Sequence, residues 1–127
     1  MKIYAIGKNI PTFAFANLLT EGEHCADTID FFVDRFYEGN DISDCAFIIS
    51  GYGDGTETSA SLTKTVFEDK IRLRWNVSRF FTASAGTLKL EIKASRTEND
   101  TVVYVLKYIM PPVNVNPSPE SDESDEE

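Results

Sequence analysis

Residues 70–77 alternate strictly between polar and apolar side chains, and this pattern constrains the fold more than any other feature of the chain. Because successive side chains of a β-strand point to opposite faces, the segment is predicted to be a strand with one dry and one solvated face. Residues 86–94 repeat the pattern. The side chains expected to point inward from the two segments are Ile71, Leu73, Trp75, Val77, Leu88, Leu90, Ile92 and Ala94.

Much of the remaining sequence up to residue 110 is also typical of strands separated by turns. We expect further strands at residues 2–6, 12–19, 28–37, 45–50, 56–67 and 100–110. The apolar run 45–50 is expected to be covered on both faces, and Gly51–Gly55 to form a flexible hairpin loop. Residues 78–85 break the alternation, and Phe80 and Phe81 suit a helical turn that plugs one end of a sandwich. Seven or eight short strands at this spacing predict an all-β fold, an immunoglobulin-like antiparallel β-sandwich.

The charge of the chain is concentrated at its C-terminal end. The formal net charge is −9, but six of the last eight residues are acidic. Without those six, 15 of the 21 acidic residues remain against 12 basic ones, so the rest of the chain carries about −3. We therefore divide the chain into a β-sandwich domain at 1–111 and a disordered, Pro-rich acidic tail at 112–127. The tail either solvates the domain or tethers it to a basic partner surface.

Residues that carry enzyme or metal chemistry are few, which predicts a non-enzymatic protein without cofactor or metal. His24 is the one histidine, and its neighbour Cys25 is not expected to meet it, because strand neighbours point apart. Cys25 and Cys45 are interpreted as buried free thiols. Asn40, Asp41 and Asp44 are assigned to turn chemistry, since they lack the ligand spacing of a calcium loop. No basic stripe indicates nucleic-acid binding, and no apolar run is long enough to span a membrane.

Side chains expected on the outer faces are the candidates for an interaction surface. Basic residues of the two alternating strands form one patch if both strands share a sheet; the alternative is a solvated face. The strand at 100–110 has apolar residues on both sides, which is typical of a central strand or a subunit contact. The candidate interface residues are Arg72, Arg74, Lys89, Lys93, Tyr104, Tyr108, Phe32 and Phe36.

Three segments of the chain share a pattern of strands and turns. They are Phe31-x-Val33-x-Arg35-Phe36-Tyr37-Glu38-Gly39-x-Asp41-Ile42-Ser43, Lys64-Thr-Val-Phe-Glu-Asp-Lys70-Ile-x-Leu-x-Trp75 and Gly86-Thr-Leu-Lys-Leu-Glu-Ile92. Together they resemble the N-terminal domain of tailed-phage baseplate upper proteins and related minor structural proteins. The resemblance covers about residues 26–110, contains no catalytic signature and implies an immunoglobulin-like module that docks onto a phage tail tip, often as a trimer.

The sequence thus leads to a structural protein of a tailed phage or prophage virion that acts through protein–protein contacts. We expect its partners to be other virion proteins and further copies of itself, with assembly in the cytoplasm of a bacterial host. One alternative is a capsid decoration or head-fibre-base protein. Another is a small carbohydrate- or cell-surface-binding module, in which Tyr52 and the glycine-rich loop offer a stacking platform.

Overall fold

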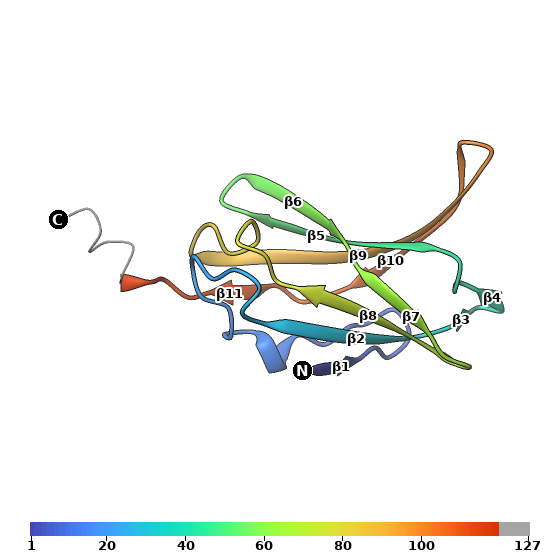
Figure 1. Cartoon of the computed structure of the whole chain (residues 1–127), viewed down its shortest axis with the longest axis horizontal. Coiled ribbons are helices and arrows are strands. Elements are labelled where there is room, and N and C mark those ends of the chain that lie inside the picture. The colour runs from blue at the N-terminus through green and yellow to red at the C-terminus, as the bar shows by residue number, and fades with distance from the viewer. Residues whose placement is uncertain (120–127) are drawn as a thin grey trace.

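The computed structural model describes residues 1–119, which form an all-β body of two larger sheets and one small hairpin. One sheet has the strand order β1-β2-β8-β7, and we call it the β2–β8 sheet. The other has the order β10-β9-β5-β6, with β11 also paired to β9, and we call it the β5–β9 sheet (Figure 1). The strands are β1 Lys2–Tyr4, β2 Thr28–Asp34, β3 Phe36–Tyr37, β4 Asn40–Asp41, β5 Ala46–Gly53, β6 Thr56–Ser61, β7 Thr63–Val66, β8 Lys70–Asn76, β9 Gly86–Glu98, β10 Thr101–Ile109 and β11 Val113–Val115.

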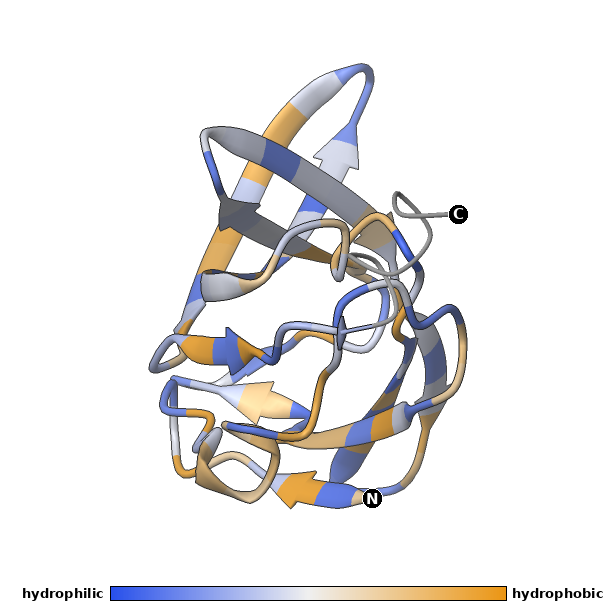
Figure 2. Cartoon of the chain, turned by 90° about the vertical axis from the view of Figure 1, so that its left-hand side faces the viewer, coloured by the Kyte–Doolittle hydropathy of each residue, from blue (hydrophilic) through white to orange (hydrophobic). Residues whose placement is uncertain are grey.

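The two alternating segments form β8 and β9, and their apolar faces enclose one hydrophobic core. All eight side chains predicted to point inward from residues 70–77 and 86–94 are buried. The view along the long axis shows hydrophobic and hydrophilic bands alternating along the strands (Figure 2). Trp75 lies at the centre of an aromatic cluster, with ring centroids 6.3 Å from Phe31, 6.4 Å from Phe15 and 5.1 Å from Phe81. The all-β, largely antiparallel architecture is therefore confirmed; β1, parallel to β2, is an exception.

Residues 12–19 do not form the expected strand. A 3-10 helix spans Phe13–Phe15 and is followed by turns. Phe15 and Leu19, four residues apart, are both completely buried, whereas Phe13 is exposed. The apolar side chains of this segment thus belong to turns that pack over the core. The prediction was wrong because a short apolar run does not distinguish a strand from a helix.

Two strand expectations are corrected where the chain passes between sheets. Residues 56–67 split at the buried Leu62 into β6 of the β5–β9 sheet and β7 of the β2–β8 sheet. The run 45–50 is not covered on both faces, because Phe47 and Ile49 are buried while Ala46 is exposed. Both corrections depend on which segments pair and pack together in the folded chain. A strand-length apolar pattern in the sequence does not encode those partners.

The expected disordered tail begins too early at residue 112. Val113 and Val115 are buried, and β11 pairs with the start of β9, so the folded body continues past Pro111 and Pro112. The prolines end β10 but leave the next three residues free to pair. Residues 120–127, which hold the acidic run, lie outside the described residues.

The segment 78–85 closes one end of the core with a hydrogen-bonded turn and bends, not with a helix. The amide of Phe81 donates to the carbonyl of Ser78, and the Phe81 ring is buried edge-on against Trp75. Phe80 points outward and is 67% exposed. The plugging role predicted for the two phenylalanines therefore belongs to Phe81 alone.

Candidate functional site

The basic residues proposed as one patch lie on two different sheets. Arg72 and Arg74 are in β8 of the β2–β8 sheet, whereas Lys89 and Lys93 are in β9 of the β5–β9 sheet. Both pairs alternate along their strands with buried apolar residues, so their side chains point away from the core between the sheets. The condition that both strands share a sheet is not met, so the single basic patch is wrong.

The outer face of the β2–β8 sheet carries a row of aromatic rings around Arg72. Register places Tyr4 beside Phe32, Phe32 beside Arg72, and Arg72 beside Thr65. The rings of Tyr4 and Phe32 stack with centroids 4.9 Å apart. On the other side, the Arg72 guanidinium lies 5.9 Å from the centroid of Phe67, within the range of a cation–π contact. We call Tyr4, Phe32, Arg72 and Phe67 the aromatic–arginine row.

Arg72 has no carboxylate partner within residues 1–119, unlike the neighbouring cations of β8, Lys70 and Arg74. Arg74 donates two hydrogen bonds to Asp30, at 2.8 and 3.1 Å, and Lys70 pairs with Asp34. The Arg74 hydrogen bonds lower the pKa of the Asp30 carboxyl below its usual value. Arg72 donates from Nη2 to the Thr65 hydroxyl at 3.2 Å, and its Nε is buried without a partner in this part of the chain. The guanidinium therefore keeps a positive charge that no carboxylate of residues 1–119 neutralises, on a face lined with rings.

Sequence reasoning found two members of this row, Phe32 and Arg72, and missed Tyr4 and Phe67. Tyr4 reaches the row because β1 runs parallel to β2, a pairing between residues 28 positions apart in the sequence. Phe67 follows β7 at the hairpin turn into β8. The alternation of Tyr4 with buried Ile3 was the available signal, since it marks Tyr4 as outward-facing.

Phe36 is exposed but lies outside the row. It belongs to β3 of the small β3–β4 hairpin, which follows β2 at the end of the sheet (Figure 1). The guanidinium of Arg35 lies 5.4 Å from its ring centroid. Arg35 also binds Asp41 across the hairpin, at 3.0 Å.

The tyrosines of β10 do not lie on an outer face. Tyr108 is buried in the core, and burial raises the pKa of its phenol well above the usual value. Tyr104 is half-buried on the same side of β10, with the guanidinium of Arg96 5.4 Å from its ring. Tyr108 is therefore wrong as an interface residue of the folded chain. The exposed apolar residues of this strand are instead Val102, Val103, Val105 and Ile109.

On the outer face of the β5–β9 sheet, Lys89 borders a shallow hollow around Tyr52. The hollow encloses about 340 Å³ and is lined in addition by Ser50, Glu57 and Glu91. Tyr52 is 51% exposed and stands directly beside Lys89 and Glu57 in the sheet register. Lys93 lies further along β9, opposite Ile48 and Lys107. The hollow combines one exposed ring with hydrogen-bonding side chains.

The acidic residues near 40–44 form ion pairs at the corner beside the β3–β4 hairpin. Asp41 accepts hydrogen bonds from Arg35 and from the Ser43 amide, and these hold the pKa of Asp41 well below its usual range. Asp44 pairs with Arg96 of β9 at 2.8 Å. Within residues 1–119, no group of three or more His, Cys, Asp or Glu side chains could hold a metal ion. The turn assignment of these carboxylates fits their contacts.

His24 and Cys25 meet, contrary to expectation. Cys25 has φ 57° in a turn, and this left-handed conformation brings its Sγ 3.6 Å from Nε2 of His24. The Arg79 amide donates to Nδ1 of His24 at 2.9 Å, which fixes the ring. Cys25 is also exposed, whereas Cys45 is buried as predicted. The rule that strand neighbours point apart fails here because the segment is not a strand.

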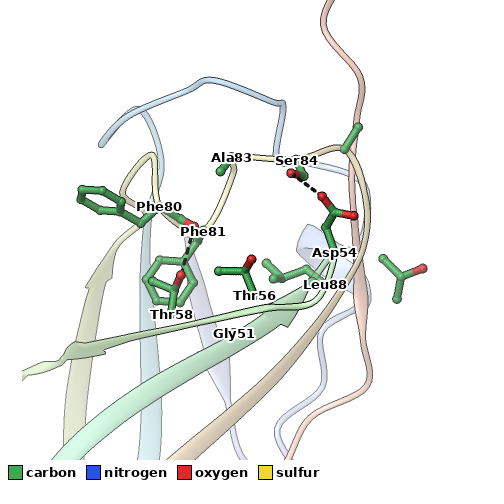
Figure 3. A pocket seen from close by; sticks show the side chains of 12 residues that line it. Gly51, Asp54, Thr56, Thr58, Phe80, Phe81, Ala83, Ser84 and Leu88 are labelled. Carbon is green, nitrogen blue, oxygen red and sulfur yellow. Dashed lines mark hydrogen bonds between the residues drawn. The ribbon is translucent and has the colours of Figure 1, made fainter.

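A second, smaller hollow lies between the β5–β6 hairpin and residues 80–88 (Figure 3). It encloses about 80 Å³. Gly51 belongs to β5, not to a flexible loop, and a Cβ there would lie 2.8 Å from the Phe81 ring. The polar contacts are those of Ser84 with Asp54, at 3.3 Å, and of Thr58 with the Phe80 carbonyl, at 3.3 Å. The glycine is thus explained by packing against the Phe81 ring.

No protein-family model matches this chain, and no curated protein matches it. Within residues 1–119, no helix is long and apolar enough to cross a membrane.

Proposed function

We propose that this protein is a non-enzymatic docking module that acts through protein–protein contacts on the outer face of its β2–β8 sheet. The aromatic–arginine row carries this proposal. Tyr, Phe and Arg are the residue types enriched at protein interfaces, where buried rings and guanidinium groups supply most of the binding energy. Tyr4 is 53% exposed and Phe67 is 44% exposed, so a partner can still bury much of both rings. Arg72 has no carboxylate partner within residues 1–119, so its positive charge is available to an acidic group of this partner.

We further propose that the fold is an immunoglobulin-like sandwich and that the module belongs to a tailed-phage or prophage virion. The support is the resemblance of residues 26–110 to baseplate upper proteins, together with the face-to-face sheets that such a module uses. Its partners are then other virion proteins, at the tail tip or, in the alternative, at the capsid or head fibres. Residues Phe32 and Arg72 fall within the resembling region and within the row.

Immunogold electron microscopy of purified virions tests this assignment. Particles would be induced from the bacterium that carries the gene and labelled with an antibody against the chain. Label at the tail tip is the expected result, and label on the capsid would favour the decoration protein. Purified particles without label, from cells that express the chain, would contradict a virion role.

A small carbohydrate-binding module is the second candidate, favoured by the hollow around Tyr52. An exposed ring can stack on the apolar face of a sugar while Glu57, Glu91 and Lys89 bind its hydroxyl groups. A glycan array probed with the wild type and with Tyr52→Ala tests this function. Glycan binding that Tyr52→Ala abolishes would favour it over the docking module.

A further inference from the structure

The β10 strand forms one edge of the β5–β9 sheet, and most of this edge is open. The backbone of Ile109 is bonded on this side to the segment 8–10: the Ile109 amide donates to Lys8 at 2.8 Å, and the Ile10 amide donates to Ile109 at 2.9 Å. In an antiparallel strand, backbone groups of alternate residues point to the same side. The amides and carbonyls of Lys107 and Val105 therefore also point outward, where no other segment of residues 1–119 pairs with them.

Three exposed side chains in the middle of this open edge are apolar, between Thr101 at one end and Lys107 at the other. Val102, Val103 and Val105 are all about half-exposed or more, on a hairpin that projects from the body at the end opposite β11 (Figure 1). The other edge of the same sheet, β6, has the sequence Thr-Glu-Thr-Ser-Ala-Ser. Natural sheet edges are usually protected by polar or charged side chains, as β6 is. An open apolar edge instead favours the addition of another strand.

We propose that the open β10 edge pairs with the β10 edge of a second copy of this chain, antiparallel about a two-fold axis near Tyr104. The free edge runs from Thr101 to Lys107, so its midpoint is Tyr104, next to a β-bulge between Val102 and Tyr104 where the register with β9 shifts. This pairing sets Val103 of each copy against Val105 of the other and joins the two β5–β9 sheets into one. It closes after two copies, because both open edges are then used.

The charges of the hairpin agree with this arrangement. Its tip is acidic, with Glu98 and Asp100, and its base is basic, with Lys93 and Lys107 side by side. Antiparallel pairing lays the acidic tip of each copy along the basic base of the other. Parallel pairing would place the two tips together and the two bases together, with like charges adjacent. The complementarity therefore selects the antiparallel, two-fold dimer and not the trimer expected from the resemblance.

Sedimentation velocity of the full chain over a micromolar concentration series tests the dimer. The wild type is expected to shift from monomer to dimer as its concentration rises. The double variant Val103→Lys/Val105→Lys places like charges opposite each other across the axis, and we expect its dimer dissociation constant to rise about tenfold or more. Val103→Glu/Val105→Glu is expected to do the same. An equimolar mixture of the two variants should regain the dimer, since opposite charges then meet.

The matched control is Ser59→Lys/Ser61→Lys on the polar β6 edge, which should dimerise like the wild type. Far-ultraviolet circular dichroism establishes that each variant is folded. A wild type that stays monomeric at every concentration, a trimer, or a dimer unaffected by the β10 variants would overturn the proposal. The experiment uses no virion, so its outcome is separate from that of the docking function.

Discussion

The outer faces of the two sheets carry similar numbers of basic residues but use them differently. On the β2–β8 face, Arg74 and Lys70 are neutralised by Asp30 and Asp34, and Arg72 remains among aromatic rings. On the β5–β9 face, Lys89 and Lys93 alternate along β9 with Glu91 between them, and none of the three has an ion pair within residues 1–119. The comparison teaches that neighbouring strands, not the sequence of one strand, decide whether a charge is neutralised, solvated or available to a partner.

The largest effect is expected from Trp75→Ala, which removes the core support beneath the Arg72–Arg74 face. Trp75 is 2% exposed and contacts three other rings. We expect a loss of about 3–5 kcal/mol in the free energy of unfolding, as for other large buried aromatics. Urea denaturation followed by circular dichroism measures it. A loss below about 1 kcal/mol would mean that the two sheets do not depend on this ring.

Val115→Ala tests whether β11 belongs to the β5–β9 sheet. Val115 is buried opposite Gly86, and we expect its truncation to lower the free energy of unfolding by about 2 kcal/mol. The matched control is Val66→Ala, the same truncation at an exposed position of β7, with an expected change of about 0.5 kcal/mol or less. Equal effects of the two variants in the same urea assay would mean that residues 113–115 belong to the tail and not to the folded body.

Asp30→Asn tests the neutralisation of the β2–β8 face. At neutral pH we expect a loss of about 1 kcal/mol in the free energy of unfolding, because a partly exposed bidentate pair is lost. Folding lowers the pKa of Asp30, so its stabilisation is present above the unfolded value of about 4 and is lost as the pH falls through the folded value. The wild type and the variant should therefore converge in acid.

Glu91→Gln on the opposite face is the control for this pH dependence. Glu91 has no ion pair in the described part of the chain, and we expect a change within about 0.5 kcal/mol at neutral pH. A gap between wild type and Asp30→Asn that stays constant down to the acid transition would contradict the role given to the Asp30–Arg74 pair.

The smallest effect is expected from deletion of residues 120–127. These residues include no apolar side chain, so the melting temperature should stay almost unchanged. The formal net charge changes from −9 to −3, because six acidic residues are removed. Weaker charge repulsion should instead lower the solubility of the body. Calorimetry and a precipitation assay separate the two effects. A melting temperature several degrees lower would show that the acidic run stabilises the folded body.

Local patterns in the sequence were enough to predict β8, β9 and their buried side chains, but not the 3-10 helix at Phe13–Phe15, the strand β11 or the pairing of the strands. The inward residues of β8 and β9 follow from alternation, which depends on neighbours two residues apart. The sheet change at Leu62 and the parallel β1–β2 pair depend on contacts between distant segments, and so the row at Arg72 was only half predicted. Tyr108 shows the same limit, since its apolar strand has one buried and one exposed side.

Co-sedimentation with virions that lack the protein tests the central claim, that the aromatic–arginine row is the docking face. Purified wild type would be compared with Phe32→Ala and Arg72→Ala on the β2–β8 face, and with Lys93→Ala on the β5–β9 face as the matched control. The two row variants are expected to raise the dissociation constant about tenfold or more, as hot-spot residues do, while Lys93→Ala changes it about twofold or less. Row variants that are folded and bind like the wild type, or a loss of binding confined to Lys93→Ala, would contradict the account.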